Sequence, residues 1–112
     1  MKATFEMNAK GVEIRISNKI ARVQFMLDQR VAADSNFYCP EDVGTLQDSV
    51  IPSAASGKGL LIWDEKYAKA QYYMHPNKSK DKNPNASMKW FERAKMVKKA
   101  LWEQYANAEY NK

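Results

Sequence analysis

The chain contains one cysteine and one histidine, the residues from which nucleophilic catalysis would have to be built. A cysteine nucleophile needs a base within hydrogen-bond reach, so Cys39 and His75 would have to be brought together by the tertiary fold alone. A single cysteine also leaves no internal disulfide, and a tetrahedral zinc site needs more soft ligands than one. We therefore expect Cys39 to be a structural thiol, and we expect no enzyme activity.

Phosphate and cation binding are the next chemistries to consider. Ser56-Gly57-Lys58-Gly59 resembles a phosphate loop, but the required spacing of a glycine, four residues and then Gly-Lys-Ser/Thr is absent. Glu41, Asp42 and Asp48 surround Gly44 without the ligand spacing of a calcium loop. The sequence therefore predicts a turn and solvated loop carboxylates, with no metal and no cofactor.

The charge is divided unevenly along the chain. Residues 1–65 carry 7 Lys/Arg and 9 Asp/Glu, a net of −2, whereas residues 66–112 carry 11 and 4, a net of +7. A basic half can bind nucleic acid or an acidic protein, and it can also be a solvated helix surface. The basic residues near the C-terminus are spread around the expected helix: Lys89, Arg93, Lys95, Lys98 and Lys99. Protein contact is thus favoured over nucleic acid, because Tyr, Trp, Met and Arg are enriched at protein interfaces.

Hydrophobic periodicity predicts the elements of the first half. Residues 2–7 alternate as a half-buried strand does, and residues 12–16 form a returning strand or an irregular helical turn. Ser17 is suited to cap a helix over about residues 18–34. The apolar stripe of that helix recurs at spacings of three and four: Ile20, Val23, Leu27 and Val31. Pro40 ends it, and Gly44 suits a turn.

The second half adds strands, a loop and a long helix. Residues 46–54 are expected to form a strand that Pro52 interrupts or places at an edge. Residues 59–64 give the strongest strand signal, and their apolar character suits a central strand. Residues 67–73 form either a short helix or a strand. Residues 74–87 are polar, with two prolines, and predict a long exposed loop.

Residues from about 88 to 109 predict a second long helix, capped by Asn85 or Ser87. Its expected buried stripe consists of Phe91, Ala94, Val97 or Lys98, Leu101, Tyr105 and Ala108, with Trp90 and Trp102 on the flanks. Together the elements predict one α+β domain over residues 1–112, a small antiparallel sheet packed by the two helices. No apolar run approaches the roughly 18 residues needed to cross a bilayer, and no signal-peptide core follows Met1, so the chain reads as cytosolic.

Three stretches occur in series. The first is Asp34-Ser35-Asn36 with Tyr38-Cys39-Pro40, Gly44-Thr45-Leu46 and Ser49. The second is Ile62-Trp63-Asp64 with Tyr67-Ala68-Lys69-Ala70-Gln71-Tyr72-Tyr73. The third is Lys82-Asn83-Pro84-Asn85-Ala86 with Lys89-Trp90-Phe91-Glu92-Arg93-Ala94-Lys95. Together they resemble the minor capsid proteins of tailed phages that infect Gram-positive bacteria, and more distantly the tail-completion or neck proteins of long-tailed phages.

The resemblance implies a structural virion protein of the head–tail connector, made in the host cytoplasm, without catalysis or membrane association. It implies a ring between head-closure proteins and the tail tube, with DNA passing through the channel without sequence-specific binding. We take the candidate subunit contacts to be Glu41, Asp42, Asp48, Tyr72, Tyr73, His75, Lys78, Lys80, Lys82, Lys89 and Arg93. The alternatives are a small nucleic-acid-binding module and a capsid decoration protein.

Overall fold

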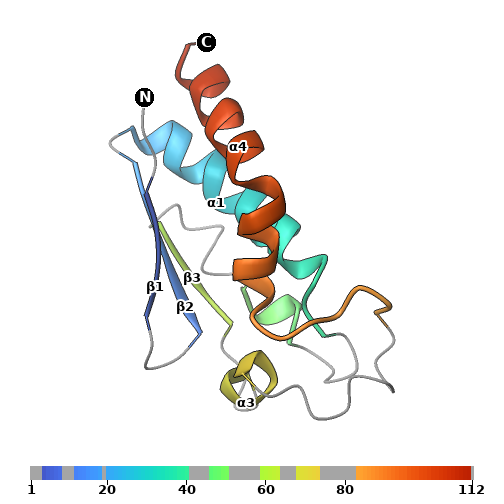
Figure 1. Ribbon diagram of the computed structural model, residues 1–112. Helices are drawn as coiled ribbons and strands as arrows, with labels where there is room; N and C mark the ends of the chain where they lie inside the picture. The colour runs from blue at the N-terminus through green and yellow to red at the C-terminus, as the bar shows by residue number, and fades with distance from the viewer. Residues whose placement is uncertain are drawn as a thin grey trace.

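The computed structural model describes residues 4–8, 12–18, 20–40, 46–50, 59–63, 68–73 and 83–111. Its elements follow in the order β1 (Thr4–Asn8), β2 (Glu13–Ser17), α1 (Ala21–Asn36), η1 (Asp48–Val50), β3 (Leu60–Ile62), α3 (Ala68–Tyr73) and α4 (Trp90–Tyr110). The described strands form an antiparallel sheet in the order β1-β2-β3. Helices α1 and α4 lie over the same face of this sheet (Figure 1). The predicted α+β fold, with a small antiparallel sheet packed by two helices, is confirmed.

The two faces of the sheet differ in polarity. One face points toward the helices and consists of two buried cross-strand pairs. These are Phe5 of β1 with Ile16 of β2, and Ile14 of β2 with Leu61 of β3. The opposite face, here called the sheet outer face, consists of Thr4, Glu6, Glu13, Arg15, Ser17, Leu60 and Ile62. This alternation settles the first open alternative in favour of a strand, which spans Glu13–Ser17.

One strand assignment needs correction. The strongly apolar segment 59–64 was expected in the centre of the sheet, but in the described sheet β2 is central and β3 lies at an edge. Leu61 is fully buried beneath the helices, while Leu60 and Ile62 on the outer face are only half-buried. An edge strand can thus be apolar on both faces, since Leu61 packs beneath the helices while Leu60 and Ile62 lie on the sheet outer face.

Helix α1 begins three residues later than predicted and ends two residues later. Ser17 does not cap it, because Ser17 is the last residue of β2, paired with Thr4. Instead the side-chain oxygen of Asn18 accepts a hydrogen bond from the Ile20 N–H at 2.9 Å, and the helix starts without a side-chain cap. The predicted stripe is confirmed: Val23, Leu27 and Val31 are fully buried, with Ile20 packed against them.

The predicted strand at residues 46–54 is wrong over its described part. Leu46 and Gln47 form a turn, and Asp48–Val50 is a single turn of 3₁₀ helix. The Ser49 hydroxyl and the Ser49 N–H both donate to the Leu46 carbonyl, at 2.7 and 3.3 Å, and this local bonding competes with a strand ladder. Residues 51–58, including Pro52, lie outside the described residues. Residues 68–73 are helical, which settles the second open alternative.

Helix α4 also starts differently from the prediction. Neither Asn85 nor Ser87 caps it; the N-cap is Lys89, whose φ of 52° is left-handed. A side chain in that conformation costs about 1–2 kcal/mol. The Lys89 N–H donates to the Tyr72 carbonyl at 2.7 Å, so a contact with α3 helps to hold the strained residue.

The buried face of α4 follows the prediction only in its first turns. Phe91 and Ala94 are buried as expected, but the face then continues through Trp102, Ala106 and Glu109. Val97 and Leu101, assigned to the core, are 55% and 48% exposed. Leu101 and Trp102 differ by about 100° around the helix axis. Because Trp102 is buried in place of Leu101, the buried face of α4 is rotated relative to the predicted one.

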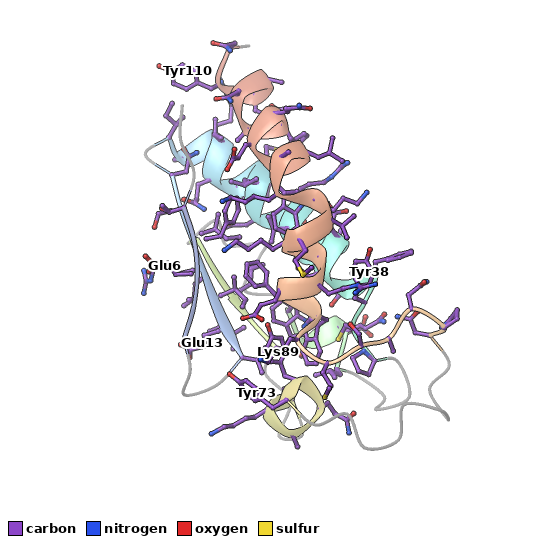
Figure 2. All side chains as sticks on the ribbon, in the orientation of Figure 1. Glu6, Glu13, Tyr38, Tyr73, Lys89 and Tyr110 are labelled. Carbon is purple, nitrogen blue, oxygen red and sulfur yellow. The ribbon has the colours of Figure 1, made fainter. Side chains whose placement is uncertain are left out.

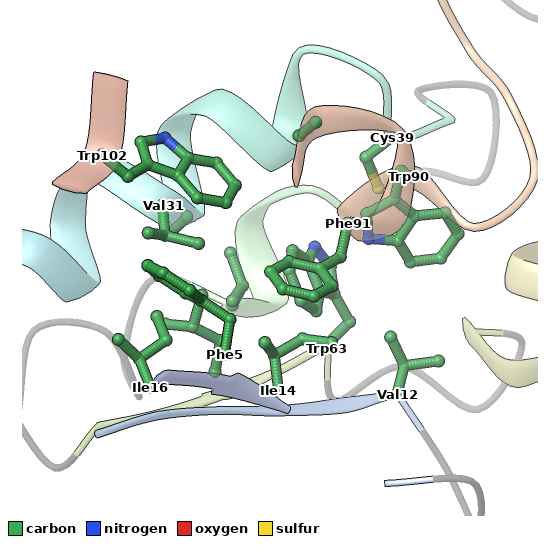
Figure 3. Packing of buried hydrophobic residues seen from close by; sticks show 14 of the residues in the cluster. Phe5, Val12, Ile14, Ile16, Val31, Cys39, Trp63, Trp90, Phe91 and Trp102 are labelled. Carbon is green, nitrogen blue, oxygen red and sulfur yellow. The ribbon is translucent and has the colours of Figure 1, made fainter. Parts of the chain in front are cut away.

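Aromatic rings fill the space between the helices and the sheet (Figure 3). Trp102 lies 5.5 Å from Phe5 and 6.1 Å from Phe91, measured between ring centroids. Trp90 lies 5.8 Å from Trp63 and 4.5 Å from Tyr72, both edge to face. Burial of each large apolar side chain is worth about 1.5–3 kcal/mol, so these rings dominate the stability of the core.

A carboxylate is buried where α1 meets the start of β3. Asp28 is fully buried, and its two oxygens accept from the Gln24 amide at 2.7 Å and from the Gly59 N–H at 2.8 Å. Burial raises the pKa of Asp28 above its ordinary value of 3.8, although both hydrogen bonds act in the opposite direction. The charge at neutral pH therefore has a free-energy cost that the two donors reduce.

This burial predicts a pH dependence. Because the folded state binds the Asp28 proton more tightly than the unfolded state, the contribution of Asp28 to stability is lost as pH rises through its raised pKa. As pH falls from 7 toward 3.8, the free energy of unfolding of the parent protein is expected to rise relative to that of Asp28→Asn, which does not titrate. Urea unfolding of both proteins across this range measures the difference. A constant difference would contradict a raised pKa.

Candidate interaction surface

The C-terminal end of α1 is tied to distant parts of the chain through Asn36. The Asn36 amide donates to the Gln47 carbonyl at 2.8 Å, and its side-chain oxygen accepts from the Trp63 indole N–H at 2.9 Å. The Gln47 amide in turn donates to the Cys39 carbonyl at 2.8 Å. The described parts of the stretch 34–49 therefore form a bonded corner between α1, η1 and β3.

The segment that leads into α4 is fastened to the same corner. The Asn83 amide donates to the carbonyls of Phe37 and Cys39 at 2.9 and 3.0 Å, and the Ser87 N–H donates to the Tyr38 carbonyl at 3.0 Å. Ala86 is buried, whereas an exposed loop was predicted here. Residues 83–87 thus lie against the end of α1; residues 74–82 of the predicted loop lie outside the described residues.

These bonds place an aromatic and cationic patch beside the first turn of α4. The Arg93 guanidinium lies over the Tyr38 ring, 6.0 Å from its centroid, and Phe37 meets Tyr38 edge to face at 4.9 Å. Phe37 is 55% exposed and Met88 is 50% exposed. Tyr38 lies beside α4 on the side away from the sheet (Figure 2).

An apolar stripe continues from this patch along α4. Met96, Val97 and Leu101 are 80%, 55% and 48% exposed, and Ala100 between them is exposed. We call these four residues the α4 outer stripe. Their spacing of three and four places Val97 and Leu101 on one face of the helix, which is turned away from the buried Trp102 and Ala106. A monomer leaves this face without an apolar partner within the described part of the chain.

The predicted contact residues fall into three groups. Lys89 and Arg93 are exposed at the start of α4, next to the α4 outer stripe, and Asp48 is exposed at the start of η1. Tyr72 is fully buried against Trp90, with Tyr73 packed beside it, so Tyr72 lies in the core of the subunit and not on its surface. Outside the described residues lie Glu41, Asp42, His75, Lys78, Lys80 and Lys82.

Two side chains with nucleophilic or acid–base groups, those of Cys39 and Tyr72, lie in the core. Cys39 is buried, and burial, with a smaller effect of Glu92, raises the pKa of Tyr72. Among the residues that the structure describes, no group of three or more His, Cys, Asp or Glu side chains is placed to hold a metal ion. Within the same residues, no helix has the length and apolar character needed to span a membrane.

The α4 outer stripe was not predicted, because the expected buried stripe of this helix included Val97 or Lys98 and Leu101. The signal was present: α4 carries apolar residues on two sides, with Phe91, Trp102 and Ala106 on one and Val97 and Leu101 on the other. Only one of these sides can pack against α1 and the sheet. A doubly apolar helix in a small domain is thus a sequence sign of a second contact surface.

Comparison with known proteins identifies the family of the chain. A family model described as "Minor capsid protein" matches residues 3–109. Searches of curated proteins and of solved structures each found no match. The match covers nearly the whole chain, and proteins of this family have a structural role in the virion, which implies a function other than catalysis. The chain therefore belongs to the phage minor capsid protein family and is a structural component of the virion.

Proposed function

We propose that this minor capsid protein is a subunit of the head–tail connector, and that it forms a ring between head-closure proteins and the tail tube. The observation that carries the proposal is the α4 outer stripe. Met96 is 80% exposed and Val97 is 55% exposed. Contiguous exposed apolar surface marks protein contact, so this face supports a role as one subunit among neighbours.

The composition of the surface also favours a protein partner. Phe37, Met88 and Arg93 are exposed near the start of α4, and aromatic residues, Met and Arg are enriched at interface cores. The hydrogen bonds of Asn83 hold this region to α1 before any partner arrives. A preordered surface binds at a lower entropic cost than one that must first fold.

The same surface is less suited to nucleic acid as the main ligand. A DNA-binding face depends on phosphate contacts, and the centre of this face consists of Met96, Val97 and Leu101. DNA in the connector channel would pass without sequence-specific binding, since strong phosphate contacts would hinder its movement.

Location and copy number in purified virions test the proposal. A connector ring has closed cyclic symmetry, so we expect about six to twelve copies per particle, labelled by antibody at the junction of head and tail. Quantitative mass spectrometry against the portal protein measures the number. Decoration of the capsid would instead give on the order of hundreds of copies spread over the head, and would contradict a connector role.

A further inference from the structure

We infer that the α4 outer stripe of one subunit docks on the sheet outer face of a second copy of this chain, head to tail. The inference rests on the proposed function, because a closed ring needs two different surfaces on each subunit. It specifies which surfaces these are. Neither the family match nor the resemblance of the sequence assigns this pairing of the two surfaces.

The two surfaces lie on opposite sides of the molecule. The helices cover one face of the sheet, and the α4 outer stripe is turned away from the buried face of α4. Glu6 projects from the sheet on the side away from the helices, whereas Tyr38, which contacts Arg93, lies on the opposite side (Figure 2). Contact between unlike surfaces on opposite sides repeats from copy to copy and closes into a ring when the rotation permits.

The charges of the two surfaces are complementary. Lys89 and Arg93 stand at the N-terminal end of the α4 outer stripe, and both are exposed. The sheet outer face carries Glu6, which is exposed, and Glu13, which is half-buried. Opposite potentials of this kind fix orientation and disfavour wrong partners more than they add affinity.

The remaining residues of each surface fit the same pairing. Leu60 and Ile62 place half-buried apolar side chains on the sheet outer face, where Val97 and Leu101 can cover them. The sheet also carries the exposed Arg15, and the flank of the α4 outer stripe carries the exposed Glu103, a carboxylate of the opposite sign. Each surface therefore contains an apolar part and both charges.

A symmetric contact between two α4 helices is the competing arrangement. Such a contact uses the same surface on both copies, closes at two subunits and leaves no route to a larger ring. It would also leave the sheet outer face without a partner. A head-to-tail contact, by comparison, gives both surfaces a partner and can extend beyond two copies.

The contact is small, which determines how it must be tested. From Lys89 to Leu101 the helix rises about 18 Å at 1.5 Å per residue. With a width of about 10 Å, such a strip covers far less than the roughly 800 Å² that each partner buries in a stable complex. One contact in isolation is thus weak, and closure of the ring adds the further stability that the assembly needs. Chemical cross-linking therefore suits this contact better than a binding titration.

The test uses paired cysteines in the full chain and a short bis-maleimide cross-linker. Arg15→Cys marks the sheet outer face and Val97→Cys marks the α4 outer stripe; the native Cys39 is buried. The double variant is expected to give a ladder of covalent oligomers. An equimolar mixture of the two single variants should stop at dimers, and each single variant alone should stay monomeric.

Several outcomes would overturn the inference. Covalent dimers from Val97→Cys alone would establish the symmetric α4 contact instead, and a double variant that stays monomeric would exclude the head-to-tail contact. Gln29→Cys with Val97→Cys is the matched control, since Gln29 is exposed on α1 away from the sheet outer face; it should give no ladder.

Charge exchange provides a second readout. In the double-cysteine background, Glu6→Lys should reduce the ladder to the level of the single variants, and so should Lys89→Glu with Arg93→Glu. All three substitutions together should restore it, and failure to restore it would contradict the charge pairing. The two proposals can fail separately. If the double variant forms the ladder but the protein is located elsewhere in the virion than the head–tail junction, the connector role is refuted and the head-to-tail contact stands.

Discussion

Replacement of Trp102 by alanine is expected to lower the free energy of unfolding by about 3–5 kcal/mol, the usual cost of truncating a large buried aromatic residue. The indole is completely buried, between Phe5 of β1 and Phe91 of α4. Its N–H donates to a carboxylate oxygen of Asp34 at 2.6 Å, which ties α4 to α1. The substitution therefore leaves a cavity and removes an interhelical bond together. Urea unfolding followed by far-UV circular dichroism measures the loss.

Two further variants separate the causes of this loss. Trp102→Phe retains most of the packing and removes the N–H, so it should cost less, about 1–3 kcal/mol, while Asp34 keeps its ion pair with Arg30 at 3.4 Å. Leu101→Ala is the matched control, because the side chain next to Trp102 is 48% exposed; its effect should stay within about 0.5 kcal/mol. Equal losses from Leu101→Ala and Trp102→Ala would mean that α4 packs through the other face.

The fold was largely predictable where one local pattern decided the outcome. Alternation of Phe5 with Thr4 and Glu6 identified β1, and the stripe of Val23, Leu27 and Val31 identified α1. Each pattern has one apolar side and one polar side, so only one orientation buries the apolar residues. Local periodicity is then enough to place both the element and its buried face.

Prediction failed where two local solutions competed or where distant residues decided. Helix α4 is apolar on two sides, and the pairing of Trp102 with Asp34, 68 positions away, selects the buried one. The start of α4 follows from the contact of Lys89 with Tyr72 rather than from a local cap at Ser87. Asn83 reaches carbonyls 44 and 46 positions away. No local propensity encodes such contacts.

The charged residues of the candidate surface were predictable from the sequence, but its apolar residues were not. Lys89 and Arg93 were expected at the surface from charge alone, and they are exposed. Tyr72 was expected there from its aromatic type, but aromatic residues serve cores and interfaces alike, and its ring packs at 4.5 Å from that of Trp90. The apolar half of the surface emerged only after the structure assigned Trp102 to the core.

Substitution of Gly59 by alanine is expected to cost about 2–5 kcal/mol, although it adds a single methyl group. Gly59 has a φ of +72°, where a side chain costs about 1–2 kcal/mol. A Cβ at this position would collide with the backbone carbonyl oxygen of Ile16 and would lie 3.1 Å from the Gln24 amide nitrogen. The backbone at the start of β3 must therefore move, and the loss appears in the free energy of unfolding measured in urea.

That movement should act mainly through Asp28. The Gly59 N–H donates to the buried carboxylate at 2.8 Å, and a buried acceptor that loses its partner costs about 1–3 kcal/mol. Asp28→Ala alone removes the same bond from the other side. The losses of Gly59→Ala and Asp28→Ala should thus be less than additive in the double variant, because residues that share one bond are coupled. Strict additivity would mean that Gly59→Ala acts through Ile16 alone, and that the contact between Asp28 and Gly59 does not hold β3 against α1.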